Sequence, residues 1–572
     1  MTHVRPERDL LHLRGATTGW YAADTVYAIN LSPLASMDQA HLLAAAGRVA
    51  ARAIARPRPL LRRAGRLARE LSGIALGRSI RAPASNDRRF ADIAFRENAL
   101  YRRTMQAYLA FADALVGLPS ELALDAKSQE RGRLAISLVA DALAPTNTLI
   151  GNPAAVKRAF ETGGMSLARG VRNLARDVVD NGGMPAQIAR AAFRVGENLA
   201  VTPGEVVLRT EVLELLQYSP RTDAVYERPL LIVPPQINKY YVLDLAPGRS
   251  LVEYAVSKGF TVFVVSWRNP TPAQRDWGMD TYVGALCEVV DAVCAITDGE
   301  RLNVLGACAG GITTAVLLGH LAARGDDRVA AATFPVTVLD TSAASPFSVH
   351  VTEKTIASAL ARSQRKGVLT GREMSRAFAW LRPNDLVWNY WVNNYLLGLP
   401  PPSFDILFWN NDVTNLPAAL HAEFLELLLK NSLCHPGALN ALGTPVDLTK
   451  VQAEVYAVGA LTDHITPWQA CYRTPRLFGG ARTFVESSSG HIQALVNPPG
   501  NERAAFLTSD TYEADEAVWL KVARKYQGSW WDHWATWLSA RSGGQRRARE
   551  TLGNAAYPPL GSAPGRYVHQ HA

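Results

Sequence analysis

Cys308 is the residue whose type and surroundings point most directly to covalent chemistry. The segment Gly306-Ala307-Cys308-Ala309-Gly310 has the spacing G-x-C-x-G, and it lies between an apolar run typical of a strand and one typical of a helix. This pattern predicts a nucleophile elbow, a sharp strand-to-helix turn that needs small residues on both sides of the nucleophile. The positive potential of the helix N-terminus would favour a thiolate there. The alternative is a tight turn with an incidental buried cysteine.

An elbow of this kind needs an acid and then a histidine later in the chain. Asp463 follows an apolar β-rich run in GALTDHITPW, and His491 follows another in SSSGHIQALVNPP. We therefore expect Cys308, Asp463 and His491 to act together. His464, which adjoins Asp463, is the alternative base. Asp340, at the end of another predicted strand, is the alternative acid.

The backbone N–H of Ala309 is expected to supply one half of an oxyanion hole. The other half should come from the loop that follows the run LLIVPP. Pro235 has no N–H to donate, so Gln236 and Ile237 are the candidates, and we favour Ile237. Asn238, in the same loop, is a candidate substrate contact.

These side chains must be positioned by a sheet, and the second part of the chain has the pattern of one. Short apolar β-rich runs alternate with helical stretches such as 280–296, which predicts a mostly parallel sheet covered on both faces. The predicted strands are 228–235, 260–267, 301–306, 329–340, 453–460 and 481–486. The long interval at about 341–450 predicts a lid or cap insertion.

Aromatic residues are concentrated in this insertion, since 378–409 contains nine in 32 residues where the chain average is 8%. They are Phe378, Trp380, Trp388, Tyr390, Trp391, Tyr395, Phe404, Phe408 and Trp409. The insertion has either its own aromatic core or an apolar surface that excludes water, binds acyl chains or meets another subunit. A second stripe, at Trp530, Trp534 and Trp537, has helical spacing and suits packing or contact with an external hydrophobic surface.

The composition and length of the chain indicate how it is organised outside these motifs. With 572 residues, 48% hydrophobic and 19% charged, it is long and apolar enough for a large folded core. Residues 1–204 have helical periodicity and form a predicted N-terminal domain, and 205–572 form the predicted catalytic domain. The net charge of +9 is partly local, because 51–70 holds seven arginines and one acid. That segment suits an anionic surface, a coenzyme A phosphate or nucleic acid, or is a solvated helix face.

Several classes of protein are excluded or disfavoured by simple features. The N-terminus lacks the apolar region of a secretory signal, and no run of 18 apolar residues predicts a transmembrane helix. Five cysteines with no C-x-x-C pair favour a reducing cytoplasm. The basic segment lacks interleaved aromatics, so nucleic-acid binding is not expected. No metal site or cofactor is expected.

A cysteine in place of serine favours acyl transfer. A thiolate that attacks a thioester forms a second thioester at nearly equal free energy, and transfer of that acyl group to an alcohol is then downhill. Water must be excluded, or hydrolysis competes. Cys308 thus favours transfer from coenzyme A to a hydroxyl over ester hydrolysis.

Longer motifs carry a family resemblance. The stretches include RPLLIVPPQINKYYVLDL, FVVSWRNPT, NVLGACAGG, LRPNDLVWNYWVNNYLLG, FDILFWNND, DHITPW, SGHIQALVNPPGN and GSWWDHW. With them the chain resembles poly(3-hydroxyalkanoate) synthases from about residue 85 to its end. It is most similar to the single-subunit class II type, which prefers medium-chain monomers. The resemblance implies an α/β-hydrolase fold with a cap, (R)-3-hydroxyacyl-CoA as substrate, and a cytoplasmic homodimer on polyester granules, which the tryptophan stripe could contact. The alternatives are a thioesterase or polyester hydrolase of the same fold and an inactive granule-coating scaffold.

The resemblance also implies roles for individual residues. Cys308 would carry the acyl group and His491 would activate its thiol. Asp463 would help to activate the 3-hydroxyl that attacks next, as well as assist the histidine. Trp409, within FWNND, would be a candidate for dimer contacts. The Arg-rich stretch 51–70 has no counterpart in the resemblance.

Overall fold

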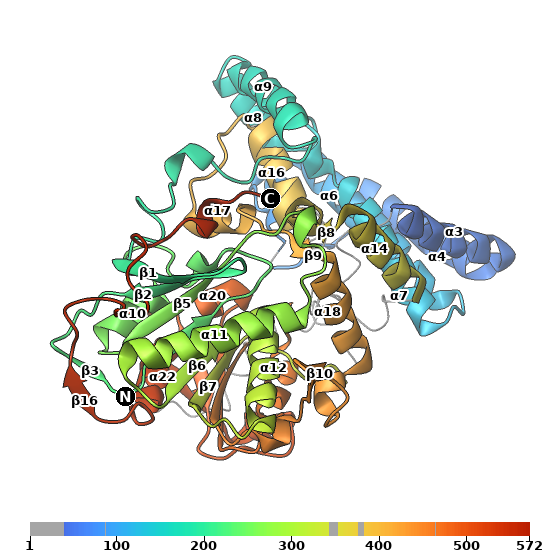
Figure 1. The fold of residues 1–572 in the computed structure, drawn as a ribbon. Coiled ribbons are helices and arrows are strands. Elements are labelled where there is room, and N and C mark those ends of the chain that lie inside the picture. Colours follow the sequence, from blue (N-terminus) through green and yellow to red (C-terminus); the bar gives the residue numbers. More distant parts are fainter. Residues whose placement is uncertain (1–38, 86, 343–352, 376–382, 464) are drawn as a thin grey trace.

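The fold was determined from a computed structural model that describes residues 39–85, 87–342, 353–375, 383–463 and 465–572 (Figure 1). A ten-stranded sheet lies at the centre of the catalytic part. In sheet order the strands are β1 (Gly204–Arg209), β2 (Leu213–Tyr218), β5 (Val262–Trp267), β4 (Leu230–Val233), β6 (Leu302–Gly306), β7 (Val329–Pro335), β12 (Glu454–Ala460), β13 (Arg482–Ser487), β14 (Ala505–Thr508) and β15 (Arg524–Gln527).

The six predicted strands form the centre of this sheet, from β5 to β13, and pair in parallel. The predicted strand 329–340 is shorter than expected, since β7 ends at Pro335. Both edges of the sheet are antiparallel and were not predicted: β1 and β2 at one edge, β14 and β15 at the other. Their sequences mix charged and apolar residues. Glu214 of β2, for example, is fully buried and accepts hydrogen bonds from the backbone N–H groups of Arg566 and Tyr567.

Two large hydrophobic clusters cover the two faces of the sheet, because successive strand residues point to opposite sides. In β4, Leu231 and Val233 belong to one cluster, and Leu230 and Ile232 to the other. The helices of the first cluster are α11 (Met279–Thr297), α12 (Ala309–Ala323), α18 (Ala418–Lys430), α19 (Trp468–Arg473) and α21 (Glu516–Val522). Those of the second are α10 (Leu251–Ser257), α17 (Asp405–Asn411), α20 (His491–Leu495) and α22 (Trp530–Ser539). The tryptophan stripe of α22 is packed into this second cluster.

The chain between β7 and β12 is an insertion at one crossover, because these two strands are parallel neighbours in which Ala331 lies opposite Glu454. Its helices include α14 (Glu353–Lys366), the π-helical turns Asn384–Trp388 and Val392–Leu396, α16 (Asn389–Trp391), α17 and α18. Its short strands are β8 (Val368–Leu369), β9 (Leu416–Pro417), β10 (Asn440–Ala441) and β11 (Thr444–Pro445). The cap limits of 341–450 remain a prediction.

The N-terminal region is helical, as expected. Its longer helices are α3 (Gln39–Ala55), α4 (Pro57–Ala75), α6 (Ala99–Val116), α7 (Ala126–Ala142), α8 (Pro153–Glu161) and α9 (Met165–Asp180). Figure 1 shows them as an arm along the cap side of the molecule, with α8 and α9 at one end and α3 and α4 at the other. The first strand begins at Gly204, and the domain boundary at 204 remains a prediction.

Cap aromatics attach this arm to the catalytic part. The indole Nε1 of Trp391 donates a hydrogen bond to the Asn147 carbonyl at 3.0 Å, and the Tyr395 hydroxyl donates one to Asp177 at 2.8 Å. The ring centroids of Trp391 and Tyr395 are 5.1 Å apart, and Trp388 lies 6.0 Å from Trp391. These aromatics therefore form a core shared between cap and arm. Phe378 and Trp380 lie outside the described residues.

Candidate active site

Cys308 occupies the turn between β6 and α12. Its backbone angles are φ 50° and ψ −119°, a left-handed conformation that side chains other than glycine rarely adopt. The turn is held because the Cys308 N–H donates to the Pro335 carbonyl at 3.1 Å. Strain at a single residue that the surrounding structure maintains is typical of functional sites. The half-buried Cys308 side chain lies at the top of the sheet, where the predicted elbow would place it.

The glycines of the elbow are required by close packing. A Cβ on Gly306 would lie 2.5 Å from the Thr314 hydroxyl oxygen and 2.8 Å from the Cα of Gly311. A Cβ on Gly310 would lie 2.4 Å from the Val233 carbonyl oxygen. Real Cβ atoms essentially never approach other atoms so closely. The G-x-C-x-G spacing therefore reflects the approach of α12 to β4 and β6.

His491 and Asp463 form a buried hydrogen-bonded pair. The Nδ1 atom of His491 is 2.7 Å from Oδ2 of Asp463, and both side chains are almost inaccessible to solvent. Asp463 follows β12, and His491 opens α20 directly after Gly490. The ring is thereby oriented with its other nitrogen, Nε2, directed away from Asp463, which is the arrangement that catalytic triads use.

The charge environment of this pair is unusual. Burial alone would lower the pKa of His491, but the Asp463 carboxylate and the Cys308 side chain raise it to about 10. Burial of Asp463 would raise its pKa, but the imidazole and hydrogen bonds from Thr466 lower it overall. A ring with such high proton affinity favours the state in which it holds a proton taken from a thiol or hydroxyl, with the Asp463 carboxylate balancing its charge.

Cys308 and His491 line the same cavity, and the cysteine side chain contributes to the raised pKa of the imidazole. The alternative acid, Asp340, lies elsewhere. Its Oδ1 accepts hydrogen bonds from the Ser342 N–H at 2.8 Å and from Asn431 at 3.1 Å. His464, the alternative base, lies outside the described residues.

Thr466 belongs to the site and was not anticipated from the sequence. Its hydroxyl donates to Oδ2 of Asp463 at 2.6 Å, and its N–H donates to Oδ1 at 2.9 Å. The Ile465 N–H donates to the same Oδ1 at 2.7 Å. With His491, the carboxylate thus has four hydrogen bonds. The D-x-x-T spacing after a strand is the available signal, because aspartates in turns accept from N–H groups two and three residues onward.

The predicted oxyanion residues lie around the nucleophile. Ala309 is the first residue of α12, so its N–H has no partner within the helix. Ile237 and Asn238 line the same cavity as Cys308. The loop that carries them is fixed at Gln236, whose Nε2 donates to the Thr313 hydroxyl at 2.8 Å. This arrangement is compatible with an oxyanion hole at Ala309 and Ile237, which remains a prediction.

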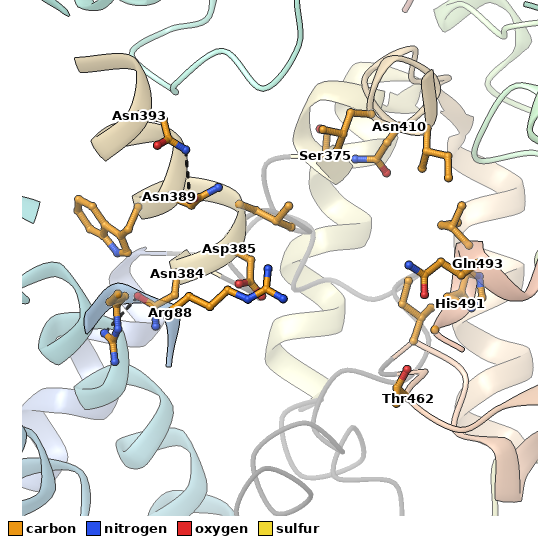
Figure 2. A pocket seen from close by; sticks show the side chains of 18 of the residues that line it. Arg88, Ser375, Asn384, Asp385, Asn389, Asn393, Asn410, Thr462, His491 and Gln493 are labelled. Carbon is orange, nitrogen blue, oxygen red and sulfur yellow. Dashed lines mark hydrogen bonds between the residues drawn. The ribbon is translucent and has the colours of Figure 1, made fainter. Parts of the chain in front are cut away.

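A cavity of about 1370 Å³ extends from Cys308 to the N-terminal helices. One wall belongs to the catalytic part and includes Thr462, His491 and Gln493. The opposite wall belongs to the cap and arm and is polar; it includes Arg88 and Asn384. Figure 2 shows these two walls facing each other, with Asp385, Asn389 and Asn393 on the polar side. The cavity is large enough for a substrate with an apolar acyl end and a long polar carrier.

Trp409 lies at the base of this cavity and is 3% exposed. Its Nε1 donates to the Lys239 carbonyl at 2.7 Å. Burial, only partly offset by the Asp412 carboxylate, lowers the pKa of Lys239 to about 8. Within one chain, Trp409 thus holds the loop next to Asn238. A contact between Trp409 and a second subunit remains a prediction.

The other four cysteines differ from Cys308 in position. All five cysteines are free and within the described residues. Cys287 and Cys294 lie on α11 against the core, and burial raises the pKa of both. Burial and the Asp340 carboxylate raise the pKa of Cys434 to about 12. Cys471 is fully buried, and burial raises the pKa of its thiol.

The described residues contain neither a candidate metal-binding cluster nor a candidate membrane-spanning helix. Among them, no group of three or more histidine, cysteine, aspartate and glutamate side chains is arranged to hold a metal ion. Within the same residues, no helix has the length and apolarity needed to cross a bilayer.

Two protein-family models match this chain. Residues 86–255 match the model described as the N-terminus of poly-beta-hydroxybutyrate polymerase (PhaC). Residues 229–498 match the alpha/beta hydrolase fold. The second match spans the sheet from β4 to the end of α20, and it confirms the predicted fold class. The first covers most of the helical arm.

Similar curated proteins extend over nearly the whole chain. Poly(3-hydroxyalkanoate) polymerase 1 of Ectopseudomonas oleovorans is 50% identical over 95% of this chain and 97% of its own length. Polymerase 2 of the same organism is 49% identical over 87% of this chain and 89% of its own. The poly(3-hydroxyalkanoate) polymerase subunit PhaC of Cupriavidus necator is 42% identical over 85% of this chain and 84% of its own.

Solved structures with a similar chain are more distant. A soluble variant of monoglyceride lipase from Saccharomyces cerevisiae is 10% identical, covers 62% of this chain and 99% of its own, and has a TM-score of 0.36. A monoacylglycerol lipase from Paleococcus ferrophilus is 12% identical, covers 58% of this chain and 99% of its own, and has a TM-score of 0.31.

Proposed function

The chain belongs to the poly(3-hydroxyalkanoate) polymerases, and from that premise we propose that it builds polyester from (R)-3-hydroxyacyl-CoA through a covalent thioester on Cys308. The enzyme class follows from the family. The nucleophile, its partners and the coenzyme A substrate are the parts that we propose. The observation that supports them most is the buried Asp463–His491 pair beside a strained elbow cysteine that opens into a large cavity.

The first step loads the enzyme. The Nε2 atom of His491 takes the proton of the Cys308 thiol, and the sulfur attacks the thioester carbonyl. The N–H groups of Ala309 and Ile237 hold the resulting oxyanion. The carbon–sulfur bond to coenzyme A then breaks, and its thiolate receives the proton from His491. One thioester replaces another, so this step is close to thermoneutral.

The second step forms the ester. The 3-hydroxyl of another acyl unit attacks the Cys308 thioester while His491 accepts its proton, and the proton returns to the departing Cys308 sulfur. An ester is more stable than a thioester, so the transfer is downhill. Asp463 is fully buried, and both its oxygens are occupied by hydrogen bonds. We therefore assign it to the orientation and charge balance of His491 in both steps.

Water exclusion separates this reaction from hydrolysis by an enzyme of the same fold. The cap and the helical arm cover the cavity into which Cys308 opens, and Trp388 and Trp409 are among its lining residues. An acyl-enzyme under such a cover is attacked more readily by a positioned hydroxyl than by solvent. This is the physical difference between a polymerase and a thioesterase at the same triad.

Three wider features are also part of the proposal. The growing polyester is a partner of the protein, which works as a homodimer at the surface of granules in the cytoplasm. The five free thiols are consistent with a reducing compartment. Because Trp409 is buried, a role in dimer formation would act through the loop at Lys239 rather than by direct ring contact.

The test is a product assay over a series of (R)-3-hydroxyacyl-CoA chain lengths. Released coenzyme A is measured with a thiol reagent, and polymer is weighed and analysed after methanolysis. The proposal predicts coenzyme A release with matching amounts of insoluble polyester. Free hydroxy acid as the main product at every chain length would instead identify a thioesterase.

A further inference from the structure

Helix α4 carries positive charge and exposed apolar side chains that take no part in the candidate active site. It lies within the Arg-rich segment and outside the residues that both family models match, since those begin at 86. Figure 1 places α3 and α4 at the end of the helical arm, beyond α6 and away from the catalytic sheet. The helix is 19 residues long and begins with Pro57, a residue that suits a first helical turn.

One face of α4 packs against the arm. Ile74 is buried, and Leu67 and Arg63 are half-buried. The guanidinium of Arg63 donates to the Asp113 carbonyl of α6 at 3.2 Å. At 3.6 residues per turn, these three positions lie on the same side of the helix. The opposite side is therefore turned to solvent.

The outer side combines an apolar strip with arginines. Leu61 is 65% exposed, and Leu60 and Leu71 are 40% and 38% exposed. Helical geometry places Ala64 and Ala68 on the same strip. Arg58, Arg62 and Arg69 follow along one edge of it and are exposed. This is the pattern of a helix that lies in the surface of a membrane, with its apolar face toward the acyl chains and its cations at the lipid headgroups.

The nearby acids leave this charge largely uncompensated. Glu121 alone pairs with Arg62, Arg63 and Arg66, so three cations share one carboxylate. Arg62 and Arg66 remain 65% and 53% exposed in these pairs. Glu70, which is the single acid of α4, pairs with Arg81 from outside the helix. The surface of α4 is therefore strongly positive.

We propose that the outer face of α4 binds an anionic phospholipid surface. Leu60, Leu61 and Leu71 enter the boundary between headgroups and acyl chains, and Arg58, Arg62 and Arg69 contact lipid phosphates. Clusters of this size on an amphipathic helix are attracted to anionic lipid by about 1 kcal/mol per basic residue. The proposal does not depend on the polymerase chemistry.

Charge and shape favour lipid over two other occupants. A second copy of the chain joined by a two-fold axis would bring the same positive face against itself. A nucleic acid would neutralise the arginines but would leave the leucine strip in water, and no aromatic residue lies on α4 to stack on bases. A bilayer surface satisfies the charge and the apolar strip together.

The experiment uses the full-length protein and vesicles of phosphatidylcholine alone or with 30 mol% phosphatidylglycerol. Co-flotation should show binding to the anionic vesicles only, weakened by salt. The pair Arg58→Gln and Arg69→Gln avoids the contacts to Glu121 and should lower the partition coefficient about 30-fold, from two lost charges. Leu61→Ser should also weaken binding at unchanged charge. Circular dichroism and the coenzyme A release rate should stay at the wild-type level, which separates this proposal from the proposed function.

The matched control is on α9, which also exposes apolar residues, among them Val171 (68%) and Val178 (57%), beside the exposed Arg172 and Arg176. Its three arginines are offset by two aspartates, whereas α4 has five arginines and one acid, so α9 lacks the positive charge that attracts anionic lipid. Arg172→Gln with Arg176→Gln removes the same charge and should leave vesicle binding unchanged. Equal binding to neutral and anionic vesicles would overturn the proposal. So would loss of binding in the α9 variant but not in the α4 variant. Binding to a single-stranded RNA oligonucleotide without vesicle binding would also overturn it, as would an α4-dependent dimer seen by light scattering.

Discussion

The catalytic part and the helical arm are stabilised in different ways. The sheet has two large hydrophobic clusters, one on each face, that run through almost every strand and covering helix. The arm has two small ones. They consist of Phe90, Phe95, Met105, Tyr108 and Ala144 in one case and Val49, Ala53, Leu118 and Leu122 in the other. The arm depends instead on polar contacts to the cap, such as Tyr395 to Asp177.

This difference indicates a division of tasks. A strained cysteine and a buried ion pair need rigid surroundings, and the sheet supplies them. The arm closes one side of the cavity and exposes more large apolar side chains to solvent than the catalytic part does. Changes in the catalytic part should therefore affect chemistry first, and changes in the arm should affect its attachment first. The predictions below test that division, from the largest effect to the smallest.

Loss of the nucleophile should have the largest effect. Cys308→Ala is expected to lower coenzyme A release at least about 10⁴-fold, because no other group can carry the acyl chain. The fold should be retained, since the side chain is half-buried and becomes smaller. Cys287→Ala on α11 is the matched control and should keep wild-type turnover. Residual activity in Cys308→Ala within ten-fold of wild type would rule out the covalent route.

Asp463→Asn should have the second-largest effect and lower turnover about 10³- to 10⁴-fold. The amide cannot balance the charge of protonated His491 and can stabilise the wrong tautomer of the ring. The control is Asp340→Asn, the other acid at the end of a strand, which has no contact with His491 and should keep near wild-type turnover. Equal losses of turnover in both variants would show that Asp463 does not assist His491. Steady-state coenzyme A release measures both.

The same pair makes stability depend on pH. His491 has its pKa raised from 6.5 to about 10 on folding, so its protonated form stabilises the fold fully below pH 6.5, and that contribution is lost as the pH rises through 10. Asp463 has its pKa lowered from 3.8, so its contribution is present above that value and is lost in stronger acid. Urea unfolding should therefore show that Asp463→Asn costs more free energy at pH 7 than at pH 10.5. A cost that does not change with pH would mean that no ion pair forms.

The smallest effect is expected where the arm meets the cap. Tyr395→Phe removes the hydroxyl that donates to the buried Asp177 and should destabilise this contact by about 1–2 kcal/mol. Limited proteolysis should cut the helical arm faster, while coenzyme A release per folded molecule stays close to wild type. If this variant lost as much activity as Asp463→Asn, the division of tasks between the two regions would be wrong.

The central strands and the positions of the three candidate residues at the ends of strands were predictable because their signals are local. Strands such as β4 are buried on both faces and are apolar throughout, and the elbow needs small residues at fixed spacing. The antiparallel edges were missed because Glu214 and Gln217 in β2 are paired by groups distant in sequence. Thr466 was missed because its role depends on two hydrogen bonds to Asp463, and these are apparent only in the folded turn. The attachment of the cap to the arm, through Asn147 and Trp391, joins segments about 240 residues apart and leaves no local pattern.

Trapping of the acyl-enzyme tests the central claim most directly. The protein is mixed with (R)-3-hydroxyacyl-CoA, quenched in acid within one turnover, digested and analysed by mass spectrometry. The account predicts a 3-hydroxyacyl group on the peptide that contains Cys308, released by hydroxylamine and absent when Asp463 is replaced by Asn. An acyl group on Cys471 or on any serine, or turnover with no acylated peptide, would contradict it.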